Sequence, residues 1–137
     1  MATNTILGLG VGLFNAALGK NYLSELANAE GSGMSLLRIA DVLDGIPQFT
    51  IDVMGGKSAD QQVDQFLSHY GITTGAAHTT AKTFVNNMLS SGKGFGAITV
   101  AANDYLLGSS VAADFQPAAT ILKNKIAVAT AFSKTYS

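Results

Sequence analysis

The 137-residue chain contains no cysteine. This absence excludes disulfide scaffolds, thiolate zinc sites, iron–sulfur clusters and cysteine nucleophiles. Charged residues are also scarce, at 12% against about 25% in an average soluble domain. Because hydrophobic residues make up an ordinary 47%, the polar surface must consist mainly of Ser, Thr, Asn, Gln and Gly. Little like-charge repulsion separates copies of such a chain, so we expect a low barrier to self-association.

The net charge of −1 is small, which argues against a nucleic-acid partner, since that partner requires a basic stripe. The charges are unevenly spread along the chain. Residues 1–70 carry seven acids and three bases, whereas residues 71–137 carry two acids and five bases. Two interpretations stay open: the asymmetry is chance, or an acidic face meets a basic face of the next copy, head to tail, in a ring or filament.

The most apolar run, Ile6 to Leu18, is too short to span a bilayer, and no transmembrane segment is predicted. Its length suits the core of a signal peptide, but no Lys or Arg precedes it. If the protein is exported, we therefore expect a route that does not read an ordinary N-terminal signal.

The dominant spacing of apolar residues is that of an α-helix. Val63, Phe66, Leu67 and Tyr70 fall at i, i+3, i+4 and i+7, and similar stripes recur along the chain. Helices are predicted near residues 5–18, 21–30, 35–45, 58–70, 76–91, 95–107 and 115–135. Residues 46–53 are the only stretch that admits a short strand, and a loop is favoured there. The predicted fold class is all-α: a compact bundle of about six or seven helices in a single domain, residues 1–137.

A weak internal repeat is present. The segments SGMSLLRIADVLDG and SGKGFGAITVAAND, which begin at Ser32 and Ser91, have apolar residues at matching positions, and each opens a helix. We therefore predict two weakly related helical units, at about 5–50 and 58–108, and a closing C-terminal helix at 115–135.

The stretch MGGKSADQ, which starts at Met54, has the glycine–lysine–serine ending of a phosphate-binding loop. The first glycine of that motif would stand at position 51, which is Ile51, and an all-helical chain lacks the preceding strand. We therefore interpret the stretch as a turn. Ser58 is the predicted N-cap of the next helix, and Gln61 completes a capping box.

No constellation of reactive side chains is recognisable. His69 and His78 are the only histidines, and their separation does not match the i, i+4 spacing of two ligands on one helix. The carboxylates at helical spacing are typical of solvated helix faces, and no calcium-binding loop is present. We predict no enzymatic activity and no catalytic, cofactor or metal site. Calcium bound between molecules stays open, without a motif that supports it.

The segment LFNAALGKNYLSELANAEGSGMSLLRIADVLDGIPQF, Leu13 to Phe49, resembles a helical module of unknown function in bacterial proteins secreted by the type I route. Some surface-layer proteins contain this module. In it, an aromatic residue and small residues lead into LGR or LGK, followed by a helix, a Ser-Gly turn and a second helix. The segment ATILKNKIAVATAFSKTYS, Ala119 to Ser137, is similar to a helix that often follows the module.

The resemblance implies a secreted, non-enzymatic domain at the bacterial cell surface. In surface-layer proteins such regions can attach the lattice to lipopolysaccharide. We accordingly expect self-assembly into a homo-oligomer or lattice, or attachment to the cell surface through lipopolysaccharide or another glycan. The alternative function is a soluble helical module that binds a small apolar or carbohydrate ligand between helices.

The glycine-spaced apolar N-terminus supplies the candidate residues for self-association, which are Ile6, Leu7, Leu9, Val11 and Phe14. Two interpretations of this segment are open. It docks on a neighbouring copy, or it folds back into the core of its own chain.

Overall fold

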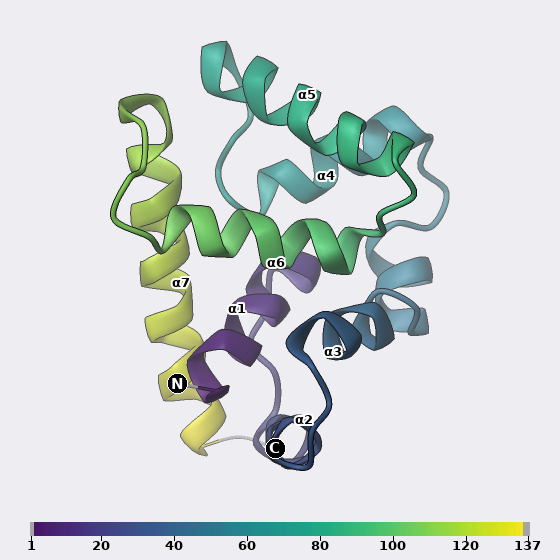
Figure 1. Cartoon of the computed structure of the whole chain (residues 1–137), viewed down its shortest axis with the longest axis vertical. Helices are drawn as coiled ribbons and strands as arrows, with labels where there is room; N and C mark the ends of the chain where they lie inside the picture. The colour runs from purple at the N-terminus through teal and green to yellow at the C-terminus, as the bar shows by residue number, and fades with distance from the viewer. Residues whose placement is uncertain (1, 136–137) are drawn as a thin grey trace.

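A computed structural model describes residues 2–135, which form α-helices joined by short turns, with no strand among them (Figure 1). The all-α prediction is confirmed. The elements in chain order are α1 (Ala2–Phe14), α2 (Lys20–Gly31), α3 (Leu36–Leu43), the π-helical turn η1 (Gln48–Val53), α4 (Ala59–Ser68), α5 (Gly75–Ser90), α6 (Phe95–Leu106), the 3₁₀ turn η2 (Ala113–Phe115) and α7 (Gln116–Thr135).

Helix α1 is the central helix of the bundle, in contact with α2, α3, α6 and α7. In Figure 1 it passes behind α6, between α7 and α3. A helix that is apolar on all sides must be covered on all sides, and the glycines of α1 let its partners approach closely. A Cβ atom on Gly12 would lie closer than 3.0 Å to the Tyr70 hydroxyl and to the methyl group of Thr99. Glycine therefore permits the close approach to α1 of α6 and of Tyr70, which follows α4.

The first helix ends earlier than the sequence predicts, at Phe14 instead of residue 18. The reason is Asn15, whose φ of +53° is left-handed and stops the helical hydrogen bonding. The Asn15 side chain is held from α7, because the Lys125 ammonium donates to Asn15 Oδ1 at 2.7 Å. The same ammonium donates to the carbonyl oxygen of His69 at 2.8 Å. Lys125 thus joins the C-terminal ends of α1 and α4 to α7.

The turns that follow α2 and α5 share one backbone geometry. Gly33 and Gly92 adopt left-handed φ angles of +108° and +91°. In each turn the next residue, Met34 or Lys93, donates its backbone N–H to the carbonyl five residues earlier, at 3.0 Å. This is the Schellman arrangement of a helix C-terminus. The two turns lie at corresponding positions of the predicted repeat, and α3 and α6, the helices that they introduce, pack against each other.

Residues 46–53 form neither a strand nor a loop. After Pro47 the chain makes the π-helical turn η1, in which the backbone N–H of Met54 donates to the carbonyl of Phe49 at 3.0 Å. Both of these side chains are buried, while Ile51 is 66% exposed. The Phe49 ring lies edge-on to Phe14, with a centroid distance of 6.0 Å. The turn therefore closes one end of the core with aromatic contacts.

Candidate functional site

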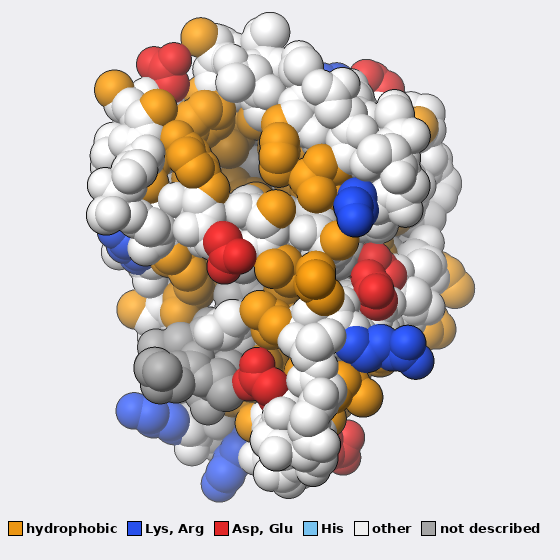
Figure 2. Space-filling model, viewed as in Figure 1, with side chains coloured by type: hydrophobic (Ala, Val, Ile, Leu, Met, Phe, Trp, Pro, Cys, Tyr) orange, Lys and Arg blue, Asp and Glu red, His pale blue; other side chains and the backbone are white. Residues whose placement is uncertain are grey.

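The most distinctive feature of the described surface is an apolar pocket of about 400 Å³ between α4, α5 and α6. Figure 2 shows it as a hollow above α6 whose walls are hydrophobic side chains. Each wall is one face of an amphipathic helix, since residues three and four apart share a face. Its principal lining residues are Phe66 and Tyr70 at the end of α4, Val85 of α5, Ala102 and Leu106 of α6, and Phe115 of η2.

No charged side chain lines this pocket within the described part of the chain. Two of its hydroxyl groups already take part in hydrogen bonds. Tyr70 donates to Asn103 Oδ1 at 2.7 Å, and the Tyr105 hydroxyl accepts from the backbone N–H of Ala112 at 2.8 Å. Burial raises the pKa of the Tyr70 phenol, so this group stays protonated at neutral pH. The pocket therefore offers its occupant apolar contact and few hydrogen bonds.

Two aromatic side chains on the pocket lining reach the surface. Phe84 of α5 is 44% exposed, and Tyr105 of α6 is 43% exposed. The Tyr105 ring is held edge-on against Phe115, with a centroid distance of 6.1 Å. Exposed aromatic rings beside an apolar hollow are a feature of binding surfaces, because they supply a large contact area at low entropic cost.

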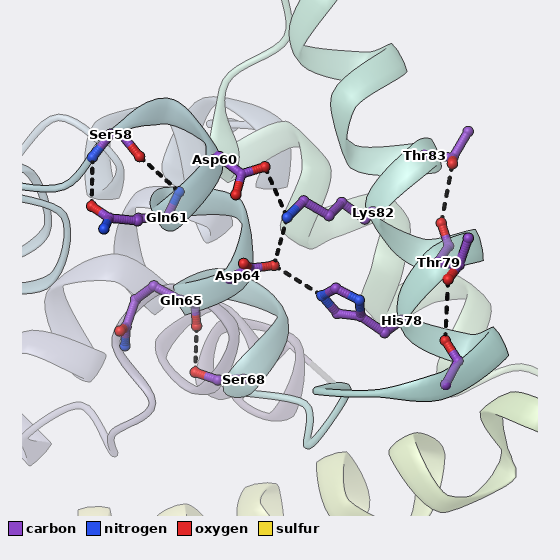
Figure 3. Close-up of polar contacts among 11 residues, drawn as sticks. Ser58, Asp60, Gln61, Asp64, Gln65, Ser68, His78, Thr79, Lys82 and Thr83 are labelled. Carbon is purple, nitrogen blue, oxygen red and sulfur yellow. Dashed lines mark hydrogen bonds and ion pairs between the residues drawn. The ribbon is translucent and has the colours of Figure 1, made fainter.

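A cluster of charged side chains joins α4 to α5 (Figure 3). The ammonium of Lys82 lies 2.8 Å from Asp60 Oδ1 and 3.0 Å from Asp64 Oδ1. His78 Nε2 lies 2.9 Å from the same Asp64 oxygen. The hydrogen bond from His78 is the main cause that lowers the pKa of Asp64, and the hydrogen bond from Lys82 is the second. These contacts fix α5 on α4 and so set the position of one pocket wall, although solvent screens their energy.

The charged cluster does not contain an activated nucleophile. The hydroxyl groups drawn near it in Figure 3 donate to backbone carbonyls instead of to His78: Ser68 to Gln65 at 2.6 Å, and Thr83 to Thr79 at 3.0 Å. Across residues 2–135, no three His, Cys, Asp or Glu side chains are placed to hold a metal ion. The cluster therefore joins two helices and has no arrangement that indicates chemistry.

The two histidines are in different environments. His69 is 2% exposed, and its Nδ1–H donates to the carbonyl of Gly12 at 2.7 Å. The opposite ring nitrogen, Nε2, is 3.0 Å from the side-chain amide of Gln65. Burial lowers the pKa of His69, so the neutral ring is favoured. His69 thus joins α4 to α1, while His78 belongs to the charged cluster.

The five side chains predicted for self-association do not form a surface. Ile6, Leu7, Leu9 and Val11 are at most 2% exposed, and Phe14 is half-buried against Phe49. The alternative, in which this segment folds back into its own chain, is what the structure shows. The physical reason is that α2, α3, α6 and α7 all pack on α1, so Ile6, Leu7, Leu9 and Val11 are not available to a neighbouring copy while the fold is kept.

No family model, no curated protein and no solved structure matches the chain. The resemblance of residues 13–49 to the type I-secreted module stays a prediction. None of the described helices is long and apolar enough to cross a membrane.

Proposed function

We propose that this chain is a non-enzymatic binding module that takes a small, neutral, apolar ligand into the pocket between α4, α5 and α6. The observation that carries the proposal is a cavity of about 400 Å³ whose described lining contains no charged group. Ligand pockets typically measure about 300–1,000 Å³, with mainly apolar walls. Of the two ligand classes considered from the sequence, an apolar ligand is favoured over a carbohydrate, because sugar hydroxyls would lose their water partners here without replacement.

The expected affinity is modest. Burying roughly 250 Å² of ligand and pocket surface would stabilise a complex by about 6 kcal/mol at 25 cal/mol per Å². The loss of translational and rotational freedom offsets a part of this gain. A dissociation constant of about 0.1–1 mM is therefore expected for a ligand without polar anchors.

Fluorescence titration with a neutral apolar probe, N-phenyl-1-naphthylamine, tests the proposal. Ala102 lies on the α6 wall and is half-buried, so Ala102→Phe should fill the pocket and weaken probe binding by about tenfold or more. The matched control is Ala127→Phe on α7, which is exposed and lies outside the pocket. Equal probe affinity of the two variants and the parent chain would show that the pocket is not the binding site.

The second candidate is self-assembly at the bacterial cell surface, with lipopolysaccharide or another glycan as the attachment partner, as the resemblance implies. One observation favours self-association through α7 instead of α1. Val128 is 70% exposed, and Phe132, one turn later, is 40% exposed. Sedimentation velocity over a range of concentrations, with and without calcium, is the test. A concentration-dependent oligomer that Val128→Gln weakens and Ala127→Gln does not would support it, and a monomer under every condition would contradict it.

A further inference from the structure

A second cavity, of about 310 Å³, lies between α1, α6 and α7 and differs in character from the first. The two linings have no residue in common. Its apolar part comes from Leu9 of α1, Val100 of α6 and Ile126 of α7, and its polar part includes Asn103, Asp104 and Lys123. An apolar floor with a few convergent polar groups is the usual composition of a small-molecule site.

Asn103 is the residue that points to a ligand. The side chain is 7% exposed, and its Oδ1 accepts the hydroxyl of Tyr70 at 2.7 Å. Its Nδ2 lies against α1, 2.9 Å from the place that a Cβ atom on Gly8 would occupy. Among the described residues, the one hydrogen bond of this side chain is the bond to Tyr70, so Nδ2 donates to none of them. Because Nδ2 is not one of the fully buried polar atoms and Asn103 lines the cavity, this donor is accessible there, and a hydrogen-bond acceptor on a ligand would accept from it.

Two charges of opposite sign accompany this donor. Asp104 follows Asn103 on α6, and Lys123 stands on α7. Neither takes part in an ion pair with another described residue. The Lys123 ammonium and the Asn103 amide both favour a carboxylate, whereas the Asp104 carboxylate favours an ammonium group. A ligand with a single charge would be attracted by one side and repelled by the other.

We propose that the cavity between α1, α6 and α7 binds a small zwitterion with an apolar side chain, the chemistry of a free amino acid such as leucine. The carboxylate of the ligand accepts from Asn103 Nδ2 and pairs with Lys123, and its ammonium pairs with Asp104. Its side chain lies against the apolar floor. The site is independent of the pocket between α4, α5 and α6, so either proposal can fail without the other.

Titration of the ¹⁵N-labelled full chain with L-leucine, followed by two-dimensional NMR, tests the site. We expect saturable shifts of the Asn103 side-chain NH₂ resonances and of the backbone amides of Leu9 and Val100. Because Asp104 and Lys123 are exposed, Asp104→Asn and Lys123→Gln should leave the fold intact and each weaken leucine binding by about tenfold. The matched controls are Asp114→Asn and Lys134→Gln, which are exposed and lie outside the cavity lining.

Analogues that lack one group separate the contributions. 4-Methylpentanoate lacks the ammonium group, 3-methylbutylamine lacks the carboxylate, and glycine lacks the apolar side chain. Each should bind about tenfold or more weakly than leucine if all three contacts form. The proposal is overturned by the absence of saturable shifts with leucine, by affinities that neither charge variant changes, or by 4-methylpentanoate binding as tightly as leucine.

Discussion

Replacement of Gly96 by alanine tests the close crossing of α3 and α6. Gly96 is buried, and a Cβ atom there would lie closer than 3.0 Å to the backbone carbonyl of Ala40 in α3. The backbone N–H of Gly96 also donates to Asp44 Oδ2 at 2.8 Å, so a residue of the first helical unit satisfies one of the free donors at the start of α6. An added methyl group must push the two helices apart and strain this hydrogen bond.

The magnitude follows from what the methyl group meets. Overpacking a core costs about 1–3 kcal/mol, and the upper part of the range applies because backbone cannot rotate away as a side chain can. Alanine is favoured over glycine in a helix by up to about 1 kcal/mol, which offsets part of the cost. We expect Gly96→Ala to lower the free energy of unfolding by about 2 kcal/mol.

Gly31→Ala is the matched control. Gly31 ends α2, does not have a left-handed φ, and has no atom within 4 Å of the position that an added Cβ atom would occupy. Only the helical preference acts there, so the control should gain between a few tenths and about 1 kcal/mol. Urea unfolding followed by circular dichroism measures both variants, and the dependence on urea should be unchanged. If Gly96→Ala is as stable as Gly31→Ala, the close crossing of α3 and α6 is incorrect.

Three further predictions concern buried polar groups and a helix cap. Burial holds the pKa of His69 below its ordinary value of 6.5, so the unfolded chain binds a proton at a higher pH than the folded chain does. The free energy of unfolding is therefore full above pH 6.5 and falls below that pH by at most about 1.4 kcal/mol per pH unit. His69→Gln should remove this slope in urea titrations. Tyr70→Phe leaves the Asn103 acceptor unpaired and should cost about 1–3 kcal/mol, and a cost no greater than that of Tyr105→Phe at the surface would contradict this. Ser58→Ala removes a capping box and should lower the melting temperature, at a cost of about 1 kcal/mol; an unchanged melting temperature would count against the cap.

Features that depend on residues close in sequence were predictable. Ser58 does cap α4: its hydroxyl accepts from the N–H of Gln61 at 3.2 Å, and the Gln61 side chain accepts from the N–H of Ser58 at 3.0 Å. The capping-box pattern was sufficient because all partners lie within one turn. The end of α1 at Phe14 was not predictable in this way. Asn15 adopts its left-handed conformation in contact with Lys125 of α7, and no local pattern contains that contact.

The burial of α1 shows a second limit of sequence reasoning. Its apolar composition indicates a helix that must be buried. Docking on a neighbouring copy and folding back into its own chain would both bury it. The choice depends on whether the chain supplies enough surface to cover it. Here α6 and α7, which come more than eighty residues later, supply that surface. The roles of Gly8 and Gly12 depend on such distant partners, because Gly8 makes room for Asn103 and Gly12 makes room for Tyr70 and Thr99.

The pocket between α4, α5 and α6 could not be predicted because its walls have the same pattern as core. The spacing of Ala81 and Val85 on α5 and of Ala102 and Leu106 on α6 shows which helix faces point inward, but not whether the faces meet. Small residues on facing helices normally allow close packing. Here Lys82 pairs α5 with α4, a cavity remains beside Ala102 of α6, and Phe84 and Tyr105 are exposed on its lining. Exposed aromatic surface is a liability on a chain with so few charges to keep copies apart. The position of this exposed aromatic surface beside an apolar cavity is what favours a ligand there over imperfect packing.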